Sequence, residues 1–482
     1  MNLKRTYNGF TVITVLLFFT GMVLFLYTGN GWYFTIPFIG CVLPFLFNYT
    51  ITATEYIFWL MIAMLPLSTE LQVTDSLGLD FPDEPLLMLL TGFCLVKWMY
   101  KPGDFPVSVL KSPVFMLIIL QVCWTVVTCF FSMNPLLSVK FLLAKSWYII
   151  PFVLLFQVII KGNSDLVRLG KLLLIPMLFV VIQALIRHAF YGYSFEGIKQ
   201  TLYPFFRNHV NYSGMLVCLL AVLWAFIKLT PVSNINYKWI ITGLIVGLIG
   251  LVLSYSRGAW LAFIMGMILM IVVHRRWMLQ FWVLLLFSVV LIFSWLVFDH
   301  HYLKFAPDHD HTVFHTDFSE HLKATVTFKD VSNAERFYRW VAGMKMIAAK
   351  PVSGFGPNNF YQYYKPYASE EFKTWVSNNP DHSTVHNYFL LLALQQGIPG
   401  LIFFLILLIM MQLQLQKLYH RLHNAFYREI AMAAAVILMM ITTLNFLSDL
   451  IETDKIGSLY WLCAGITLWL DNKLKEERQS IA

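Results

Sequence analysis

The stretch His386-Asn-Tyr-Phe-Leu390, followed at a short distance by Gly397-Ile-Pro-Gly400, decides how this chain folds. It opens an apolar segment, residues 384–416, that is too long for one membrane crossing of about 20 residues. Its first part can cover only about 20 Å as a helix at 1.5 Å per residue. Pro399 cannot continue an interior helix but suits a first turn. We therefore expect a short helix at the membrane surface and a spanning helix that begins at about Ile398.

Composition places the whole chain among the polytopic membrane proteins. Hydrophobic residues make up 59% of its 482 residues, charged residues only 12%, and the mean hydropathy is +0.67. A soluble domain cannot bury that much apolar surface. The net charge of +8 comes from Lys and Arg in separate short loops, which argues against nucleic acid as a partner. All six cysteines lie in apolar runs, so neither a disulfide framework nor a thiolate metal site is expected.

Apolar runs long enough for a spanning helix, about 17–25 residues, predict an all-α fold with fourteen spans, or twelve without the two shortest. Eleven runs precede and three follow a polar island, residues 299–397. We predict one membrane domain over residues 1–482 with the island as an inserted helical loop. The predicted spans are 10–28, 31–48, 51–67, 84–100, 113–131, 139–160, 165–187, 209–229, 238–255, 259–273, 280–298, 398–416, 430–447 and 456–470.

The distribution of Lys and Arg predicts the orientation of these spans. Cytoplasmic loops of membrane proteins carry an excess of both residues, and here they gather in alternate loops, whereas loop 68–83 has four acidic residues and no Lys or Arg. With a cytoplasmic N-terminus, the polar island lies outside the cytoplasm. The basic loop residues include Lys97, Lys101, Lys111, Lys161, Arg168, Lys228, Lys238, Arg275, Arg276, Lys417, Arg421 and Arg428.

Four motifs follow one another in the last third of the chain: Arg336-Phe-Tyr-Arg-Trp340, Pro351-Val-Ser-Gly-Phe-Gly356, and the two stretches quoted above. In this order they resemble the O-antigen ligase/polymerase superfamily of bacterial membrane glycosyltransferases. The first two hundred residues match that superfamily only in hydropathy. The resemblance implies a GT-C-type enzyme of the bacterial inner membrane that needs no metal or other cofactor. Such an enzyme transfers a glycan from undecaprenyl pyrophosphate to an acceptor hydroxyl on the periplasmic face, with inversion.

His386 is the candidate general base, because a sugar hydroxyl is a poor nucleophile until a base takes its proton. Ser383 suits the N-cap position, which would place His386 in the first turn of the short helix. The helix dipole disfavours a further positive charge there, so the imidazole is expected to be neutral near pH 7. A histidine that only caps a loop at the membrane interface is the alternative.

Arginines at the same face are candidates for binding the pyrophosphate, because guanidinium stays charged and binds phosphate oxygens in a bidentate way. The resemblance implies this role for Arg257, in Ser256-Arg-Gly258, and through a looser pattern for Arg207. The R-x-x-x-W spacing of the superfamily selects Arg336, and Arg339 on much the same helical face is its substitute. Snorkelling at the interface or a solvated charged surface are the alternatives.

For other polar groups and for the glycine motif, the sequence allows more than one role. Lys140 and Lys145 lie in the outer half of a predicted span, where ionisable groups are costly, and either add charge to a pyrophosphate site or snorkel. Gly354 and Gly356 lack the strand and the spacing of a dinucleotide motif, which favours a turn that packs the outer domain. The histidine-rich segment 300–321 has no recognised metal-ligand spacing, so no metal site is predicted.

Three acceptors are open within the superfamily: lipid A-core for a ligase, another lipid-linked glycan for a polymerase, and a protein hydroxyl for an oligosaccharyltransferase. The well-formed H-N-x-x-L and G-I-P-G motifs favour the ligase, and with it lipopolysaccharide biosynthesis. A polysaccharide or lipid transporter would have as many spans but should show repeats or broken helices near the midplane. The sequence shows no repeat and its notable polar groups gather at one face, so we predict a transferase.

Overall fold

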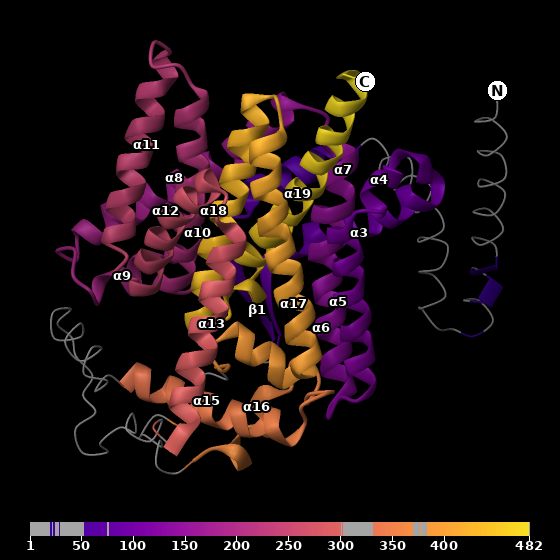
Figure 1. The fold of residues 1–482 in the computed structure, drawn as a ribbon, viewed down its shortest axis with the longest axis vertical. Helices are drawn as coiled ribbons and strands as arrows, with labels where there is room; N and C mark the ends of the chain where they lie inside the picture. Colours follow the sequence, from indigo (N-terminus) through magenta and orange to yellow (C-terminus); the bar gives the residue numbers. More distant parts are fainter. Residues whose placement is uncertain are drawn as a thin grey trace.

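The computed structural model is a bundle of long helices with a smaller group of helices and loops at one end (Figure 1). It describes residues 53–74, 77–299, 301, 331–369, 377 and 383–481, and the single positions 20, 21, 23, 24 and 28. Within these residues nine helices are long and apolar enough to cross a membrane. The protein is a mostly helical, polytopic membrane protein, as its composition predicts.

These nine helices coincide with nine predicted spans, from 113–131 to 430–447. One of them, Pro135–Ile159, contains a π-helical stretch, Ile150–Leu155, between α6 and α7. Their bounds are α5 (Pro113–Phe130), α6 (Pro135–Ile149) with α7 (Phe156–Ile159), α8 (Asn163–Ala189), α10 (His209–Leu229), α11 (Ile235–Val252), α12 (Arg257–Arg275), α13 (Met278–Val297), α17 (Tyr388–Arg421) and α18 (Ala425–Leu447).

The remaining five predicted spans do not correspond to any of the nine long apolar helices. Predicted spans 84–100 and 456–470 fall in helices α3 (Asp83–Tyr100) and α19 (Asp454–Ile481), which are not among the nine. Span 51–67 is represented by the shorter apolar helix Ala53–Met64. The first two predicted spans, 10–28 and 31–48, lie almost entirely outside the described residues. The total of twelve to fourteen spans therefore stays a prediction.

A short antiparallel hairpin departs from the expected all-helical fold. Strands β1 (Thr69–Thr74) and β2 (Leu77–Phe81) pair with Thr69 opposite Phe81. Lys455, at the start of α19, donates hydrogen bonds to the carbonyl oxygens of Ser68 and Phe205, each at 2.8 Å. The hairpin is thereby tied both to α19 and to the loop before α10.

The described part of the polar island consists of α15 (Val331–Ala349), α16 (Phe360–Tyr363) and the loops around them. Figure 1 shows both helices below the bundle, at the lower end of α13 and the start of α17. The C-terminus lies at the opposite end. Short helices α4 (Val107–Leu110) and α9 (Gly197–Thr201) lie in connecting segments. We call the end of the bundle next to α15 and α16 the island face.

Helix α17 is broken where the sequence predicts. Gly397 has φ 72° and ψ 175°, which separates a short first helix from the spanning part that begins at Ile398. The indole N–H of Trp124 in α5 donates to the carbonyl oxygen of Gln396 at 2.9 Å. The Gln396 side-chain oxygen accepts from Gln121 and Thr125, each at 3.2 Å. The break is therefore fixed by polar contacts with the neighbouring spanning helix.

The glycine-containing loop of the island packs against this break. Gly354 and Gly356 both have positive φ. The N–H groups of Phe355 and Gly356 donate to the carbonyl oxygens of Leu394 and Gln395, each at 2.9 Å. Any side chain at Gly354 would overlap the Gln395 backbone. These contacts confirm the interpretation of the motif as a packing turn.

We expect Gly397→Ala to destabilise the protein strongly. The backbone conformation of Gly397 is one that other residues adopt at a cost of about 1–3 kcal/mol, and an added Cβ would also overlap the Val352 carbonyl oxygen. The melting temperature of the protein in detergent, and its monodisperse yield, should fall. Gly92→Ala in α3 is the control, because nothing lies within 4 Å of its added Cβ. Equal melting temperatures of the two variants would contradict this assignment.

Candidate active site

His386 lies in the linker between α16 and α17, just before α17 begins. Asn387 is the N-cap, and its side-chain oxygen accepts a hydrogen bond from the Leu390 N–H at 3.0 Å. His386 itself has φ 52°, in the left-handed region. The predictions that Ser383 caps the helix and that His386 lies in its first turn are therefore wrong. The carboxamide of Asn387 can cap the helix directly, so the chain stays non-helical up to that residue.

The linker is held from two sides. The Trp340 indole N–H of α15 donates to the Val385 carbonyl oxygen at 2.9 Å. On the other side, the Tyr388 N–H donates to the carbonyl oxygen of Ser448, in the loop between α18 and α19, at 3.0 Å. His386 is thus fixed between α15 and a loop that follows it by about sixty residues.

That loop brings a carboxylate to the histidine. Asp449 Oδ1 lies 3.9 Å from His386 Nδ1. Its other oxygen, Oδ2, accepts a hydrogen bond from the Thr384 hydroxyl at 2.6 Å, and the Thr384 hydroxyl oxygen accepts from the His386 N–H at 3.3 Å. The sequence assigns Asp449 to a separate outer loop, and nothing in the local pattern indicates that it meets His386. Burial raises the pKa of Asp449.

The imidazole is neutral near pH 7. Burial, together with the positive charges of Arg339 and Arg336, lowers the pKa of His386 to about 3. This low pKa supports the predicted neutral form, with burial and two arginines as its causes. The His386 side chain keeps an exposed fraction of 35%, so a substrate can reach it.

The two arginines of α15 differ in their surroundings. Arg339 is 6% exposed, and its guanidinium donates to Glu335 Oε2 at 3.2 Å and to the Thr384 carbonyl oxygen at 3.4 Å. Glu335 also accepts from the Ser377 hydroxyl at 2.6 Å. Arg336 is half-buried, and its charge acts on His386. Arg339 therefore holds the linker in place, whereas Arg336 is the arginine that a ligand can reach.

We expect Arg336→Ala to reduce kcat/KM per folded molecule more than Arg339→Ala does. Arg339→Ala should mainly destabilise the protein, because breaking a buried ion pair costs about 3–5 kcal/mol and Glu335 would lose its cation. The two effects separate when transfer rates and melting temperatures are measured on the same preparations. The reverse order of activities would show that Arg339 is the substrate-binding residue.

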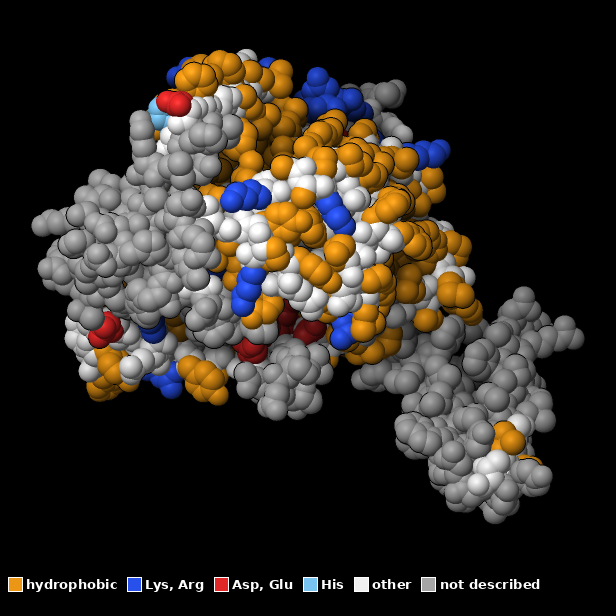
Figure 2. Space-filling view, turned by 90° about the horizontal axis from the view of Figure 1, so that it is seen from below, with side chains coloured by type: hydrophobic (Ala, Val, Ile, Leu, Met, Phe, Trp, Pro, Cys, Tyr) orange, Lys and Arg blue, Asp and Glu red, His pale blue; other side chains and the backbone are white. Residues whose placement is uncertain are grey.

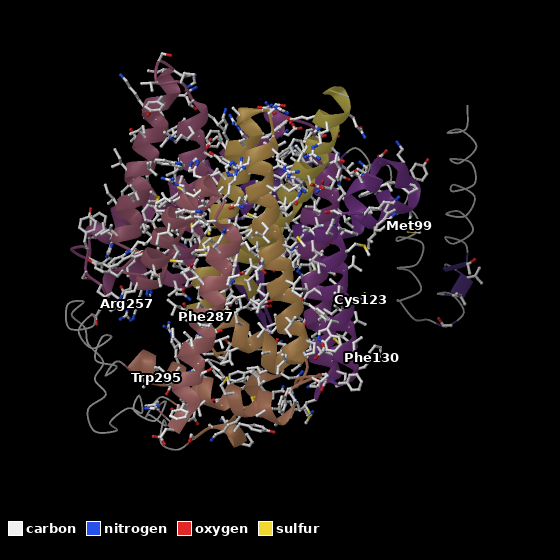
Figure 3. The ribbon with its side chains drawn as sticks, viewed as in Figure 1. Met99, Cys123, Phe130, Arg257, Phe287 and Trp295 are labelled. Carbon is white, nitrogen blue, oxygen red and sulfur yellow. The ribbon has the colours of Figure 1, made fainter. Side chains whose placement is uncertain are left out.

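The other predicted site residues lie at the island face on elements other than α15 and α17. Arg257 is the first residue of α12, at the lower end of the bundle on the side of α13 (Figure 3). Next to it, Gly258 lies against Leu447 at the end of α18, two residues before Asp449. Arg207 is 68% exposed and lies 3.8 Å from Glu70 of the hairpin.

The two lysines of α6 also differ. Lys140 is exposed near the start of the helix. Lys145 forms an ion pair with Glu452 at 2.9 Å and lies over the rings of Phe141 and Tyr388. The charge of Lys145 is therefore engaged in packing the loop between α18 and α19. Lys140 remains a candidate for an additional cation at the island face.

The island face carries no single basic patch over its described part. Figure 2 shows Lys and Arg side chains spread across this face and several Asp and Glu side chains together in a recess in the lower part of the view. An anionic ligand would thus be bound by individual arginines next to His386. No group of three or more His, Cys, Asp or Glu residues within the described ranges is arranged to hold a metal ion. Segment 300–321, apart from His301, lies outside those ranges, as do Glu370, Glu371 and Asp381.

The fold and this site define a polytopic membrane protein with a neutral histidine, a carboxylate and arginines gathered at one face. Residues 242–405 match the family model described as O-antigen ligase. The match covers about a third of the chain, and over these residues the sequence is similar to the O-antigen ligase family, which is of the ligase/polymerase type of membrane glycosyl transfer. The matched segment includes Arg257, Arg336 and His386, whereas Asp449 lies beyond it. No curated protein matches the chain significantly.

Proposed function

We propose that this protein transfers a glycan from undecaprenyl pyrophosphate to an acceptor hydroxyl, with His386 as the general base. The observation that carries the proposal is the neutral, partly exposed imidazole beside Asp449, Arg336 and Arg339, near the end of the segment that is similar to the O-antigen ligase family. A histidine that only capped the helix would need none of these neighbours, and Asn387 already fills that role.

The chemistry follows from these groups. The acceptor hydroxyl gives its proton to His386, and its oxygen attacks the anomeric carbon of the donor sugar. The bond between that carbon and the pyrophosphate oxygen breaks, and the pyrophosphate leaves with the electron pair. Arg336 and Arg257 stabilise the negative charge that gathers on it, with Arg207 and Lys140 as further candidates. One displacement of this kind inverts the configuration at the anomeric carbon.

Asp449 serves in this proposal as a positioning residue. A carboxylate next to one ring nitrogen of a histidine fixes its tautomer and stabilises the imidazolium that forms when the other nitrogen takes a proton. The distance of 3.9 Å to Nδ1 is longer than a hydrogen bond, and such contacts often tighten only when substrate binds. The Thr384 hydroxyl holds the carboxylate in place from the other side.

The distribution of charge supports a periplasmic site in the bacterial inner membrane. The basic loop residues Lys228, Arg275 and Lys417 lie at the ends of α10, α12 and α17 that are far from the island face. Cytoplasmic ends of spanning helices carry such an excess of Lys and Arg. The island face would then meet both the lipid-linked donor and a periplasmic acceptor.

We favour lipid A-core as the acceptor, and deletion of the gene tests this choice. Envelope glycans of the deletion strain are separated on a gel beside those of the parent strain. Loss of long chains from lipid A-core supports the ligase. Shortened chains would instead indicate an O-antigen or exopolysaccharide polymerase, and loss of glycoprotein bands a protein O-oligosaccharyltransferase. An unchanged glycan profile, with the lipid-linked donor made normally, would contradict transferase activity and turn attention to transport.

Transfer is expected to need no divalent cation, because fixed arginine charges can neutralise a departing pyrophosphate. A metal-dependent enzyme of this kind needs carboxylates that hold Mg²⁺ or Mn²⁺ beside the phosphates. The measurement is the rate of transfer from lipid-linked donor to acceptor in detergent, with excess EDTA and with added Mg²⁺. Activity that disappears with chelator and returns with metal would direct attention to Asp308 and Asp310, which lie outside the described residues.

A further inference from the structure

An apolar groove lies between α10, α11, α12 and α18, away from the candidate active site. Helix α11 packs closely on α10, where a Cβ at Gly247 would lie 2.7 Å from the Leu220 side chain. Helix α12 instead packs on α18, where Gly266 lies against Met440. Because the two helices pack on different neighbours, a groove remains between them. Its floor is buried and includes Ala221, Ala225, Val436 and Met440, and its rim is half-exposed and includes Leu248 and Phe263.

The length and chemistry of the groove fit one acyl chain. Along α18 it extends from Glu429 to Met440, which is about 16 Å at 1.5 Å per residue. A single leaflet provides half of a hydrocarbon core about 30 Å thick, so the groove matches one leaflet. Apart from Glu429 and the Trp224 indole nitrogen, its lining is apolar, and four methionines can adapt to an irregular chain.

Polar groups gather where the groove reaches the end of the bundle opposite the island face. Glu429 and Trp224 both line it there. The indole N–H of Trp224 is buried and has no hydrogen-bond partner among the described residues. Lys228, one turn further along α10, lies with its Nζ 5.3 Å from the centre of the Trp224 ring. A donor and a carboxylate thus line the end of the groove where a lipid head group would lie, and a cation lies beside the donor.

We propose that this groove is a binding site for one phospholipid with an amine head group, such as phosphatidylethanolamine. The acyl chain lies along the apolar floor, and an ester carbonyl oxygen accepts the hydrogen bond from Trp224. Lys228 binds the phosphate, and Glu429 binds the ammonium group. Both lipid charges are then matched, whereas an anionic lipid would leave Glu429 beside a second negative charge. This lipid site is independent of the proposed transferase activity.

Native mass spectrometry of the full-length protein tests the site. The protein is released from nanodiscs that contain phosphatidylethanolamine or phosphatidylglycerol with the same acyl chains. We expect one retained lipid and a preference for phosphatidylethanolamine of about fivefold, the upper range for an accessible ion pair. Glu429→Gln should abolish the preference for phosphatidylethanolamine, and Lys228→Gln should weaken the retention of both lipids. Lys238→Gln, at the same end of the bundle on α11, is the charge control.

Filling the groove provides a second test. Ala221→Phe should prevent lipid retention, whereas Ile264→Phe, at an exposed position of α12 that does not line the groove, should not. If Ala221→Phe does not fold, the two charge variants still decide the question. Equal retention of both lipids by the wild type would overturn the proposal. Displacement of the lipid by undecaprenyl phosphate would also overturn it, because the groove would then hold the chain of the donor.

Discussion

His386→Ala is expected to yield a folded, membrane-inserted protein whose rate of transfer is lower by about 10²–10⁴-fold, the usual contribution of a general base. The fold should survive because the contacts that hold the linker are made by Thr384, Val385 and Asn387 rather than by the imidazole. The measurement is transfer from lipid-linked donor to acceptor by purified protein, with melting temperature as the test of folding. His423→Ala, on an exposed loop at the opposite face, is the matched control.

The pH dependence of transfer provides a second test of the role of His386. The base must be neutral, and burial with the charges of Arg339 and Arg336 lowers the pKa of His386 to about 3 in the free protein. The acid limb of kcat/KM should therefore lie far below pH 6.5. A bound pyrophosphate offsets the arginine charges, so the pKa rises in the complex and the acid limb of kcat should lie at a higher pH. A twofold loss in His386→Ala, or an acid limb of kcat/KM near pH 6.5, would contradict the assignment.

Local signals in the sequence are sufficient to predict the spanning helices and the break in α17. Gly397 and Pro399 act on the backbone at their own positions, so their effect is independent of the rest of the fold. The order of motifs also predicts His386 and Arg336 at one face, and the charge of Arg336 acts on His386 in the structure. The N-cap was misplaced because Ser383 and Asn387 are both good capping residues, and tertiary contacts of the linker decide between them.

The contacts that complete the site are long-range and could not be predicted from the sequence. Asp449 lies beside His386 because two hydrogen bonds join segments far apart in the chain, from the Tyr388 N–H to the Ser448 carbonyl oxygen and from the Thr384 hydroxyl to Asp449. Arg339 is more buried than Arg336 and pairs with Glu335, and neither property can be recognised from the local sequence.

Arg257→Lys is expected to impair transfer although it keeps the positive charge. The guanidinium of Arg257 stands at the first turn of α12, where the helix dipole already favours an anion. Lysine is a point charge without the planar fork that binds two phosphate oxygens at once. If the partner is pyrophosphate, kcat/KM should fall by at least about tenfold in Arg257→Lys. In Arg257→Ala the loss should reach about 10²–10³-fold, as for removal of one preorganised donor.

If Arg257 only anchors α12 at the interface, a different result is expected. Lysine snorkels as well as arginine does, so Arg257→Lys would then bind and turn over lipid-linked donor like the wild type, and that outcome would remove Arg257 from the site. Arg276→Lys, just beyond the opposite end of the same helix, is the matched control. Both variants are compared with the wild type at several donor concentrations. A rise in KM with unchanged kcat would assign Arg257 to donor binding alone, whereas an equal fall in kcat and kcat/KM would place its contact with the pyrophosphate in the transition state.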